Sequence, residues 1–509
     1  MSISIYIEPL NKAGDLITKL LQDEFKIGDN NALLLYNNPN NGIKKHIDKL
    51  KDTTYLVAES SYVDKVYRDS FYHYYSSKLN HYKRDCIRIS LFEGEIVESD
   101  FWDPAKTLEL QGKYRGFFVL RPIEPFLIGR TIISPKALKT NDFSFCVTQF
   151  HTTSNGLKFA VIGFPHSSQD TETITCAETT LWAIMEYFGN KYSDYKPVLP
   201  SKIIHTLSTV SSERQIPSKG LNIAQMSFAL REFGFGTRVY SREEYKEEFD
   251  GLLSCYVESG IPIIIAIEHR PMIGHALLAI GHEKIDDAKI DAITPYSSSD
   301  TILKGQLTAK NLIIYDYDSV KKDFIFIDDN QPVYQRATLE NPAAHYPAHW
   351  HGCKITYFIV PLYPKIYLEA FEAKSFIIRF LVTGPEPLTD YSEILLRFYL
   401  ASSRSFKNEI AVNHTVAPDL KGLILEASMP KFIWVAELST KELIKQKKAN
   451  GMVVLDATEA NIYFNKPLIL AAYQGKVVFF EESSNKLESD SLPLPDFSIF
   501  EHNLNAFEQ

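Results

Sequence analysis

The order of hydrophobic and polar residues divides the chain into three parts of mixed α and β structure. In residues 1–160, short stretches rich in branched and aromatic residues alternate with polar positions, as half-buried strands do. Longer stretches with apolar residues three and four positions apart predict helices between them. The predicted strands are residues 2–7, 32–36, 54–58, 87–92, 114–121 and 128–133, and the predicted helices are residues 10–25, 42–50 and 62–72.

Residues 161–362 begin with helical patterns and continue with strand patterns. A helical pattern at 177–188 follows Cys176 directly. A second helix opens at Gly220-Leu221-Asn222 and is closed by Gly234, since glycine is common just after a helix. The remaining predictions are a loop containing 203–207, a helix over 243–258, and strands at 238–240, 261–267, 275–280, 312–315, 324–327 and 355–360.

Helix and strand signals are harder to separate in residues 363–509. Residues 366–380 and 391–401 fit either helices or long strands. Residues 482–494 are polar, and we expect them to be flexible. Strands are predicted at 432–438 and 452–455, with a hairpin of 468–473 and 476–480 that turns at Gln474-Gly475.

The chain of 509 residues is too long for one hydrophobic core, so we expect several domains. Its hydrophobic fraction of 45% and charged fraction of 23% are those of an ordinary globular protein. The net charge of -9 and pI of about 5.9 argue against nucleic acid as a partner. The predicted domains are an N-terminal mixed α/β domain (1–160), a central domain (161–362) and a C-terminal α+β domain (363–509).

Several features favour a cytoplasmic protein with no membrane partner. No apolar run approaches the roughly 18 residues that cross a bilayer. The first residues alternate like a strand and lack a basic segment and a cleavage site. The five cysteines are odd in number and scattered, which is typical of a reduced compartment and not of a disulfide framework.

Cys176 is the strongest candidate for chemistry because it stands at the first turn of a predicted helix. Unpaired backbone N–H groups and the positive end of the helix dipole both favour a thiolate at that position. The alternative is a buried core cysteine, the common fate of an isolated cysteine. The other four cysteines lack this context and are interpreted as structural.

His275 and the pair Asp328-Asp329 offer a base and an orienting carboxylate. His275 begins an apolar strand beside a glycine, where a polar side chain can face a cleft, whereas His282 is expected at the surface. Asp328 and Asp329 follow the apolar run at 324–327. One of them, bonded to the imidazole, would hold the ring toward the thiol, and we prefer Asp329.

Gln169 completes a pattern that resembles the papain-like cysteine peptidases, and most closely the bacteriocin-leader-processing peptidase domains. The order is Gln, Cys at a helix start, a Gly-opened helix, a Gly-His strand and an apolar strand followed by Asp, and it covers about residues 163–334. The resemblance implies a helix carrying Cys176 packed on an antiparallel sheet that carries His275 and Asp329 (or Asp328). It also implies that Gln169 is the oxyanion donor, Cys176 the nucleophile and His275 the general base.

The sequence departs from that family's pattern at three places. Gln169 lies seven positions before Cys176 instead of six, and Ala177 stands where the family usually has Gly. An insertion at 283–322 lengthens the interval between His275 and the aspartates. Insertions in loops cost little free energy.

The resemblance implies a cysteine hydrolase, most simply a protease that forms a thioester acyl-enzyme with a protein or peptide substrate. A transglutaminase, deamidase or acyltransferase would use the same triad with another acceptor. A non-catalytic binding module on a papain-like scaffold is the alternative from a different class. The flanking domains would then bind a regulator or the substrate protein. The predicted enzyme needs no cofactor.

A second polar cluster, formed by His345, His349, His351 and Cys353, contains residue types that suit zinc. Zinc sites usually take ligands from two separate elements, and no second half is evident in the sequence. We therefore predict no metal site there, and interpret the segment as an aromatic and polar loop centred on Trp350 near the cleft.

Overall fold

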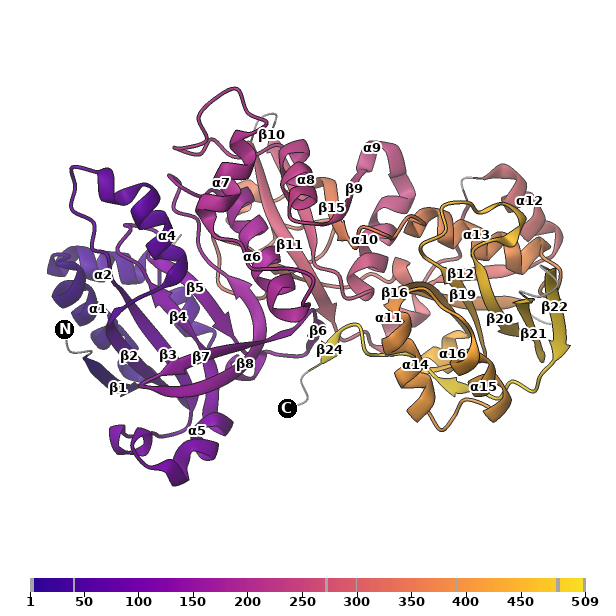
Figure 1. The fold of residues 1–509 in the computed structure, drawn as a ribbon, viewed down its shortest axis with the longest axis horizontal. Coiled ribbons are helices and arrows are strands. Elements are labelled where there is room, and N and C mark those ends of the chain that lie inside the picture. The colour runs from indigo at the N-terminus through magenta and orange to yellow at the C-terminus, as the bar shows by residue number, and fades with distance from the viewer. Residues whose placement is uncertain are drawn as a thin grey trace.

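The computed structural model describes residues 4–39, 42–270, 273–298, 300–389, 392–481 and 486–506. Within these residues the chain has an α+β fold, with three large β-sheets and one pair of short strands. Figure 1 shows the N-terminal part at one end of the long axis and the C-terminal part at the other. None of the described helices is both long and apolar enough to cross a bilayer.

The first sheet is antiparallel throughout and separates two hydrophobic cores. Side chains alternate between the faces of a strand, so Leu56 packs in the core beneath α1 (Ala13–Phe25), while Val57 packs in the core of the other face. The strand order is β1 (Ile5–Pro9), β2 (Thr54–Tyr62), β3 (Cys86–Glu93), β4 (Tyr114–Leu120), β5 (Ile128–Ile133), β8 (Leu157–His166) and β7 (Thr148–Ser154).

The second sheet is also antiparallel and has helices on both faces. Ile264 shares a core with α6 (Cys176–Lys191), and its neighbour Ile265 shares a core with α10 (Phe249–Glu258). This two-sided burial explains why its strands read as nearly continuous apolar runs. The order is β14 (Gln335–Ala337), β13 (Phe324–Ile327), β11 (Ile273–Glu283), β10 (Ile263–Arg270), β15 (Lys354–Leu362) and β9 (Gly236–Ser241), and β6 (Phe143–Phe145) adds to β11.

The third sheet belongs mainly to the C-terminal part. α13 (Ala370–Thr383) packs on one face, and α14 (Ser403–Val412) with α15 (Pro418–Glu426) packs on the other. The order is β12 (Ile313–Asp316), β16 (Glu393–Ser402), β17 (Phe432–Ser439), β19 (Gly451–Asp456), β20 (Leu468–Tyr473), β21 (Lys476–Glu481) and β22 (Lys486–Ser491).

The three sheets exchange strands across the predicted domain limits. β6, from the N-terminal part, pairs with β11 of the second sheet, and β12, from the insertion, pairs in parallel with β16 of the third. The chain end returns to the centre of the molecule, where β24 (Asn505–Ala506) pairs with β6 (Figure 1). Single strands therefore pair across the predicted limits near residues 160 and 362.

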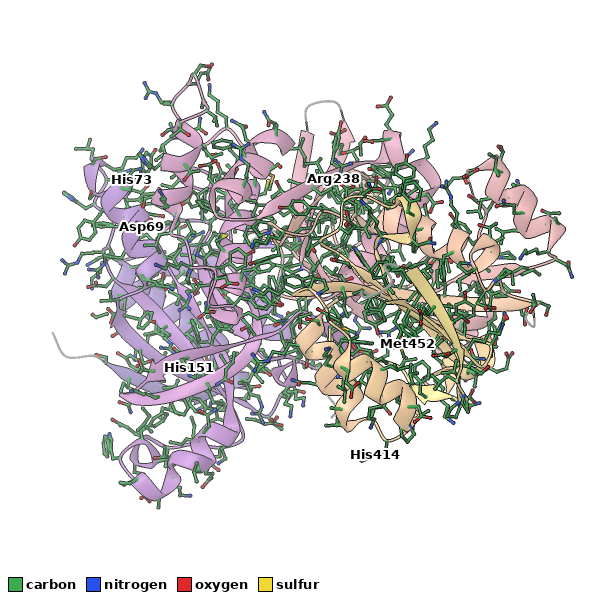
Figure 2. The ribbon with its side chains drawn as sticks, turned by 45° about the vertical axis from the view of Figure 1, so that its right-hand side comes forward. Asp69, His73, His151, Arg238, His414 and Met452 are labelled. Carbon is green, nitrogen blue, oxygen red and sulfur yellow. The ribbon has the colours of Figure 1, made fainter. Side chains whose placement is uncertain are left out.

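Helices also connect the first and second parts. Asp69, on α4 (Lys65–His73), accepts hydrogen bonds from the backbone N–H and the hydroxyl of Ser201 at 2.8 and 2.7 Å. Ser201 lies in the first turn of α7 (Pro200–Ser208), so a carboxylate from one part satisfies unpaired donors of a helix in the other. Figure 2 shows Asp69 among the side chains of this region.

Four secondary-structure predictions need correction. The predicted strand 32–36 lies in α2 (Asp29–Asn37), where the buried Ala32 and Tyr36 are one helical turn apart. The predicted loop 203–207 lies in α7, which begins at Pro200. The predicted helix 243–258 is interrupted, since Lys246 adopts a φ of 44°. Residues 486–491 of the predicted flexible stretch form β22, while 482–485, like residues 2 and 3 of the first predicted strand, lie outside the described residues.

Candidate active site

Cys176 is the first residue of α6, and the helix start is held by its own side chains. Thr175 donates its backbone N–H to the Glu178 carboxylate at 3.1 Å, an arrangement typical of helix N-termini. The helix is buried from Ala177 to Phe188, whereas Cys176 itself is half-buried. The other four cysteines are buried. Cys176 is therefore the cysteine that combines a helix N-terminus with access to solvent.

His275, on β11, interacts electrostatically with Cys176 and also contacts the aspartate pair. Its Nε2 atom lies 3.0 Å from Asp328 Oδ1, which leaves Nδ1 as the ring nitrogen available to the sulfur. Burial lowers the pKa of His275, but the negative charge and hydrogen bond of Asp328, together with Cys176, outweigh it and raise the pKa well above its ordinary value. The arrangement therefore favours an imidazolium beside the thiol.

Asp328, and not the preferred Asp329, occupies the orienting position. Its carboxylate is fully buried and accepts hydrogen bonds from His275 and from the backbone N–H of Asn330. Burial raises the pKa of Asp328, but His275 and His345 outweigh it and hold the pKa well below its usual range. The preference for Asp329 is thus corrected, because the carboxylate hydrogen-bonded to His275 is that of Asp328, directly after β13, while the nearest Asp329 oxygen lies 3.6 Å from Nε2.

Asp329 lies beside this pair without a hydrogen bond of its own. Its Oδ1 atom is 3.6 Å from His275 Nε2, and neither carboxylate oxygen has a hydrogen-bond partner among the described residues. Burial raises the pKa of Asp329 to about 7, and the charge of Asp328 adds to that effect. Within the described part of the chain, His275, Asp328 and Asp329 are also the one group that brings three potential metal ligands within 4.8 Å of one another.

His345 and Tyr346 complete the surroundings of Asp328. His345 Nε2 lies 2.9 Å from Asp328 Oδ2, and the Tyr346 hydroxyl donates to Asp328 Oδ1 at 2.9 Å. The rings of Tyr346 and Trp350 meet the His275 ring edge-on, with centroids 6.0 and 6.2 Å away. The aromatic loop thus lies against the site, although sequence reasoning did not single out His345 or Tyr346 as members of it.

The residues of the same loop whose types suit zinc have separate surroundings. His345 contacts Asp328, whereas His351 Nε2 lies 3.1 Å from the carbonyl oxygen of Tyr346. Cys353 is buried in the core beneath the sheet. The side chain of His349 lies outside the described residues.

Gln169 lies next to the aspartate loop, held by a tight turn. Its Nε2 donates to Asn330 Oδ1 at 2.8 Å. Asp170, which is buried, accepts from the backbone N–H groups of Glu172, Thr173 and Ile174. Within the seven-residue interval between Gln169 and Cys176 the chain makes this turn, and the Gln169 amide lies beside the loop that carries Asp328.

Two buried residues at strand ends of the first sheet, Arg121 directly after β4 and His166 at the end of β8, contact the two loops of the site. Arg121 donates to the carbonyl oxygens of Ser168 and Gln169, each at 2.7 Å. His166 Nε2 lies 3.1 Å from the carbonyl oxygen of Asp328 and 2.9 Å from that of Gln331. Sequence reasoning missed both residues, since neither stands in a pattern that distinguishes it from an ordinary strand-end residue.

His282 differs from its prediction as a surface residue. It is buried, and its Nε2 lies 2.9 Å from Glu258 Oε2 on α10. The prediction is wrong because helices cover both faces of the second sheet, so a side chain turned toward α10 is buried as well. His282 belongs to a buried ionic network and not to the candidate active site.

Comparison of the chain with protein-family models and with curated proteins finds no match.

Proposed function

We propose that this protein is a cysteine peptidase whose central domain is papain-like. The observation that carries the proposal is that the half-buried Cys176 lies within electrostatic reach of His275, whose Nε2 lies 3.0 Å from Oδ1 of the buried Asp328. A nucleophile, a base and an orienting group in hydrogen-bond reach of one another are the signature of nucleophilic catalysis. Gln169 adds an amide donor at the same place.

In the proposed reaction, His275 takes the proton of Cys176, and the thiolate attacks the carbonyl carbon of a peptide bond. A C–S bond forms, and the negative charge that develops on the carbonyl oxygen is stabilised by an N–H of the Gln169 side chain. The imidazolium of His275 then gives its proton to the leaving amine as the C–N bond breaks. Water, deprotonated by His275, hydrolyses the thioester and returns the thiol.

The surroundings of Asp328 support this assignment. A buried carboxylate that accepts several hydrogen bonds stays ionised, and an ionised partner keeps the imidazole in one orientation. Tyr346 and Trp350 cover the pair, and a lower local dielectric strengthens the interaction between His275 and Asp328.

The first experiment measures the reactivity of Cys176. We expect iodoacetamide to alkylate it at pH 6, where an ordinary thiol with a pKa of about 8.5 is protonated, and His275→Ala to slow that alkylation about tenfold or more. The four buried cysteines of the same chain are internal controls, followed by peptide mass spectrometry. Alkylation of Cys176 no faster than that of a free cysteine would contradict the proposal.

The second experiment identifies the acceptor. A peptide library is incubated with the protein in the presence and absence of a primary amine, and the products are sequenced by mass spectrometry. New peptide termini that Cys176→Ala abolishes support a peptidase. Amine incorporation without cleavage would show a transferase instead, and no product at all with a reactive Cys176 would contradict both activities.

A further inference from the structure

Asp328, the buried carboxylate of the candidate active site, has a second histidine beside it in addition to His275. His345 Nε2 lies 2.9 Å from Asp328 Oδ2, while His275 Nε2 lies 3.0 Å from Asp328 Oδ1. The two imidazoles therefore meet opposite oxygens of one fully buried carboxylate. A cysteine hydrolase of the proposed kind needs one histidine on this carboxylate, so the second one has a role of its own.

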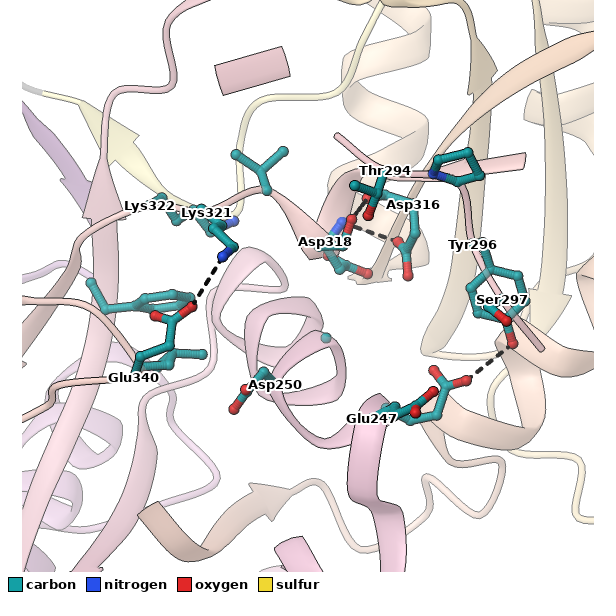
Figure 3. A pocket seen from close by; sticks show the side chains of 17 residues that line it. Glu247, Asp250, Thr294, Tyr296, Ser297, Asp316, Asp318, Lys321, Lys322 and Glu340 are labelled. Carbon is teal, nitrogen blue, oxygen red and sulfur yellow. Dashed lines mark hydrogen bonds and ion pairs between the residues drawn. The ribbon is translucent and has the colours of Figure 1, made fainter. Parts of the chain in front are cut away.

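Other buried carboxylates of this protein have partners of a different kind. At the junction of the second and third sheets, Lys374 Nζ lies 2.8 Å from Asp316 and 2.7 Å from Asp318, two aspartates that Figure 3 shows close together. An ammonium group carries a full positive charge and neutralises the carboxylates that it contacts. Within the described residues, Asp328 forms no ion pair with a lysine or an arginine.

Partners without a permanent charge leave the negative charge of Asp328 available to His275. Besides the two imidazoles, Asp328 Oδ1 accepts from the Tyr346 hydroxyl and from the backbone N–H of Asn330, each at 2.9 Å. These neutral donors stabilise the carboxylate without cancelling its charge. Against the effect of burial, that charge raises the pKa of His275.

His345 is placed as a neutral donor to Asp328. Its Nε2 carries a proton, because the atom that it faces is the oxygen of an ionised carboxylate. Its Nδ1 is buried and has no hydrogen-bond partner among the described residues, so a second proton on the ring would have no acceptor. The ring packs on that of Tyr346, with centroids 4.9 Å apart. Its nitrogens are therefore not arranged as those of a second base for Cys176.

The bond at Oδ2 helps to fix the plane of the Asp328 carboxylate. The torsion that turns a carboxylate is broad and roughly two-fold, so the group is easily rotated. Rotation moves both oxygens, and a donor at each oxygen opposes it from two sides. His345 at Oδ2 and the donors at Oδ1 together hold the oxygen that His275 Nε2 meets.

We propose that His345 is a positioning residue of the candidate active site, which holds the Asp328 carboxylate ionised and in plane so that His275 keeps its orientation toward Cys176. This role rests on the proposed triad and adds a fourth member to it. The order of action is Cys176, His275, Asp328 and His345. His345 acts through Asp328 and does not contact the reacting atoms.

The test measures how fast iodoacetamide alkylates Cys176 at pH 6, a rate that can be determined without a known substrate. We expect His345→Leu to slow alkylation at least about fivefold, because Asp328 loses a donor and holds the imidazolium of His275 less well. His345→Gln should keep at least about half of the native rate, since its amide N–H is a neutral donor that can replace the imidazole Nε2–H.

His351→Leu is the matched control. It removes a histidine of the same loop whose Nε2 lies 3.1 Å from the Tyr346 carbonyl oxygen and not from Asp328. We expect its alkylation rate to stay within about twofold of the native rate. If His345→Leu does not fold, as judged by urea unfolding, His345→Asn takes its place, because its shorter side chain does not reach Asp328 and the same slowing is expected.

A double-mutant cycle with Asp328→Asn distinguishes positioning through Asp328 from a general effect on the fold. On the Asp328→Asn background, His345→Leu should slow alkylation by less than about twofold more, since the carboxylate through which it acts is already lost. If His345→Leu slowed alkylation equally on both backgrounds, the positioning role would be overturned.

The His275→Ala variant separates this role from the proposed function on which it rests. If His275→Ala slows alkylation but His345→Leu does not, or if His345→Gln is as slow as His345→Leu, the positioning role fails and the triad stands. If His275→Ala has no effect, the triad fails and the role of His345 fails with it.

Discussion

The Nε2 atom of His166, at the end of β8, lies 3.1 Å from the main-chain carbonyl oxygen of Asp328. Burial lowers the pKa of His166 to about 4, so the ring is neutral at physiological pH. Since the acceptors at Nε2 are carbonyl oxygens, Nε2 carries the proton and donates to the loop that carries Asp328. The first sheet therefore takes part in positioning the candidate active site.

We expect His166→Ala to lower kcat about 10- to 100-fold, because the Asp328 loop loses its anchor and His275 loses its fixed orientation. The free energy of unfolding should fall by about 1–3 kcal/mol, since the carbonyl groups of Asp328 and Gln331 lose a donor. Peptide hydrolysis and urea unfolding measure the two effects. His46→Ala is the matched control, because it also removes a buried imidazole. The ring centroids of His46 and His166 are 5.8 Å apart, but His46 forms no side-chain hydrogen bond to the Asp328 loop among the described residues. Equal activity of the two variants would contradict the positioning role.

A substitution of Arg121 tests the proposed oxyanion donor, Gln169, independently of the nucleophile, Cys176. Arg121→Met removes both hydrogen bonds to the Ser168 and Gln169 carbonyls, so the Gln169 loop should move while Cys176 and His275 stay in place. We expect kcat to fall by up to about 100- to 1,000-fold, the range for loss of an oxyanion donor. The alkylation rate of Cys176 by iodoacetamide should change little. A parallel fall of both rates would show that Arg121 supports the fold as a whole.

The candidate site was largely predictable from sequence where its residues stand at the ends of strongly patterned elements. Cys176 precedes a long buried helix, and Asp328 follows a four-residue apolar strand that the structure reproduces without change. His345 and Tyr346 were not predicted, because they lie in an irregular segment and reach Asp328 only through tertiary folding.

In the fold, too, elements with a local sequence pattern could be predicted, whereas pairings between distant residues could not. Strands buried on both faces, such as β10 and β13, have apolar runs that sequence patterns detect. The parallel pairing of β12 with β16 joins residues about eighty positions apart, and no local pattern encodes it. α2 was misread because apolar residues at 32–36 are consecutive, and the helical spacing of its two buried positions is hidden among exposed leucines.

Asp328→Asn should narrow the pH range of activity. The negative charge of Asp328 is the main interaction that raises the pKa of His275 against the effect of burial, and asparagine does not carry it. The pKa of His275 should therefore fall, and the alkaline limb of the kcat/KM profile should move to lower pH, because the thiolate–imidazolium pair loses its proton earlier. Measurement of kcat/KM from pH 5 to 10 tests this, and an unchanged alkaline limb would contradict the role of Asp328.

Asp329→Asn should stabilise the protein at alkaline pH and leave it nearly unchanged at about pH 4. Burial raises the pKa of Asp329 to about 7, above the ordinary 3.8, so the folded state binds more protons than the unfolded state between these values. The free energy of unfolding of the native chain therefore falls as pH rises through this window, and the full loss is present above pH 7. Asparagine does not ionise, and we expect a gain of about 1–3 kcal/mol at pH 8 in urea unfolding. Asp23→Asn, on the exposed face of α1, is the control and should not change the free energy of unfolding differently at pH 4 and pH 8. If Asp329→Asn raised the free energy of unfolding equally at both pH values, its carboxylate would not titrate in this window.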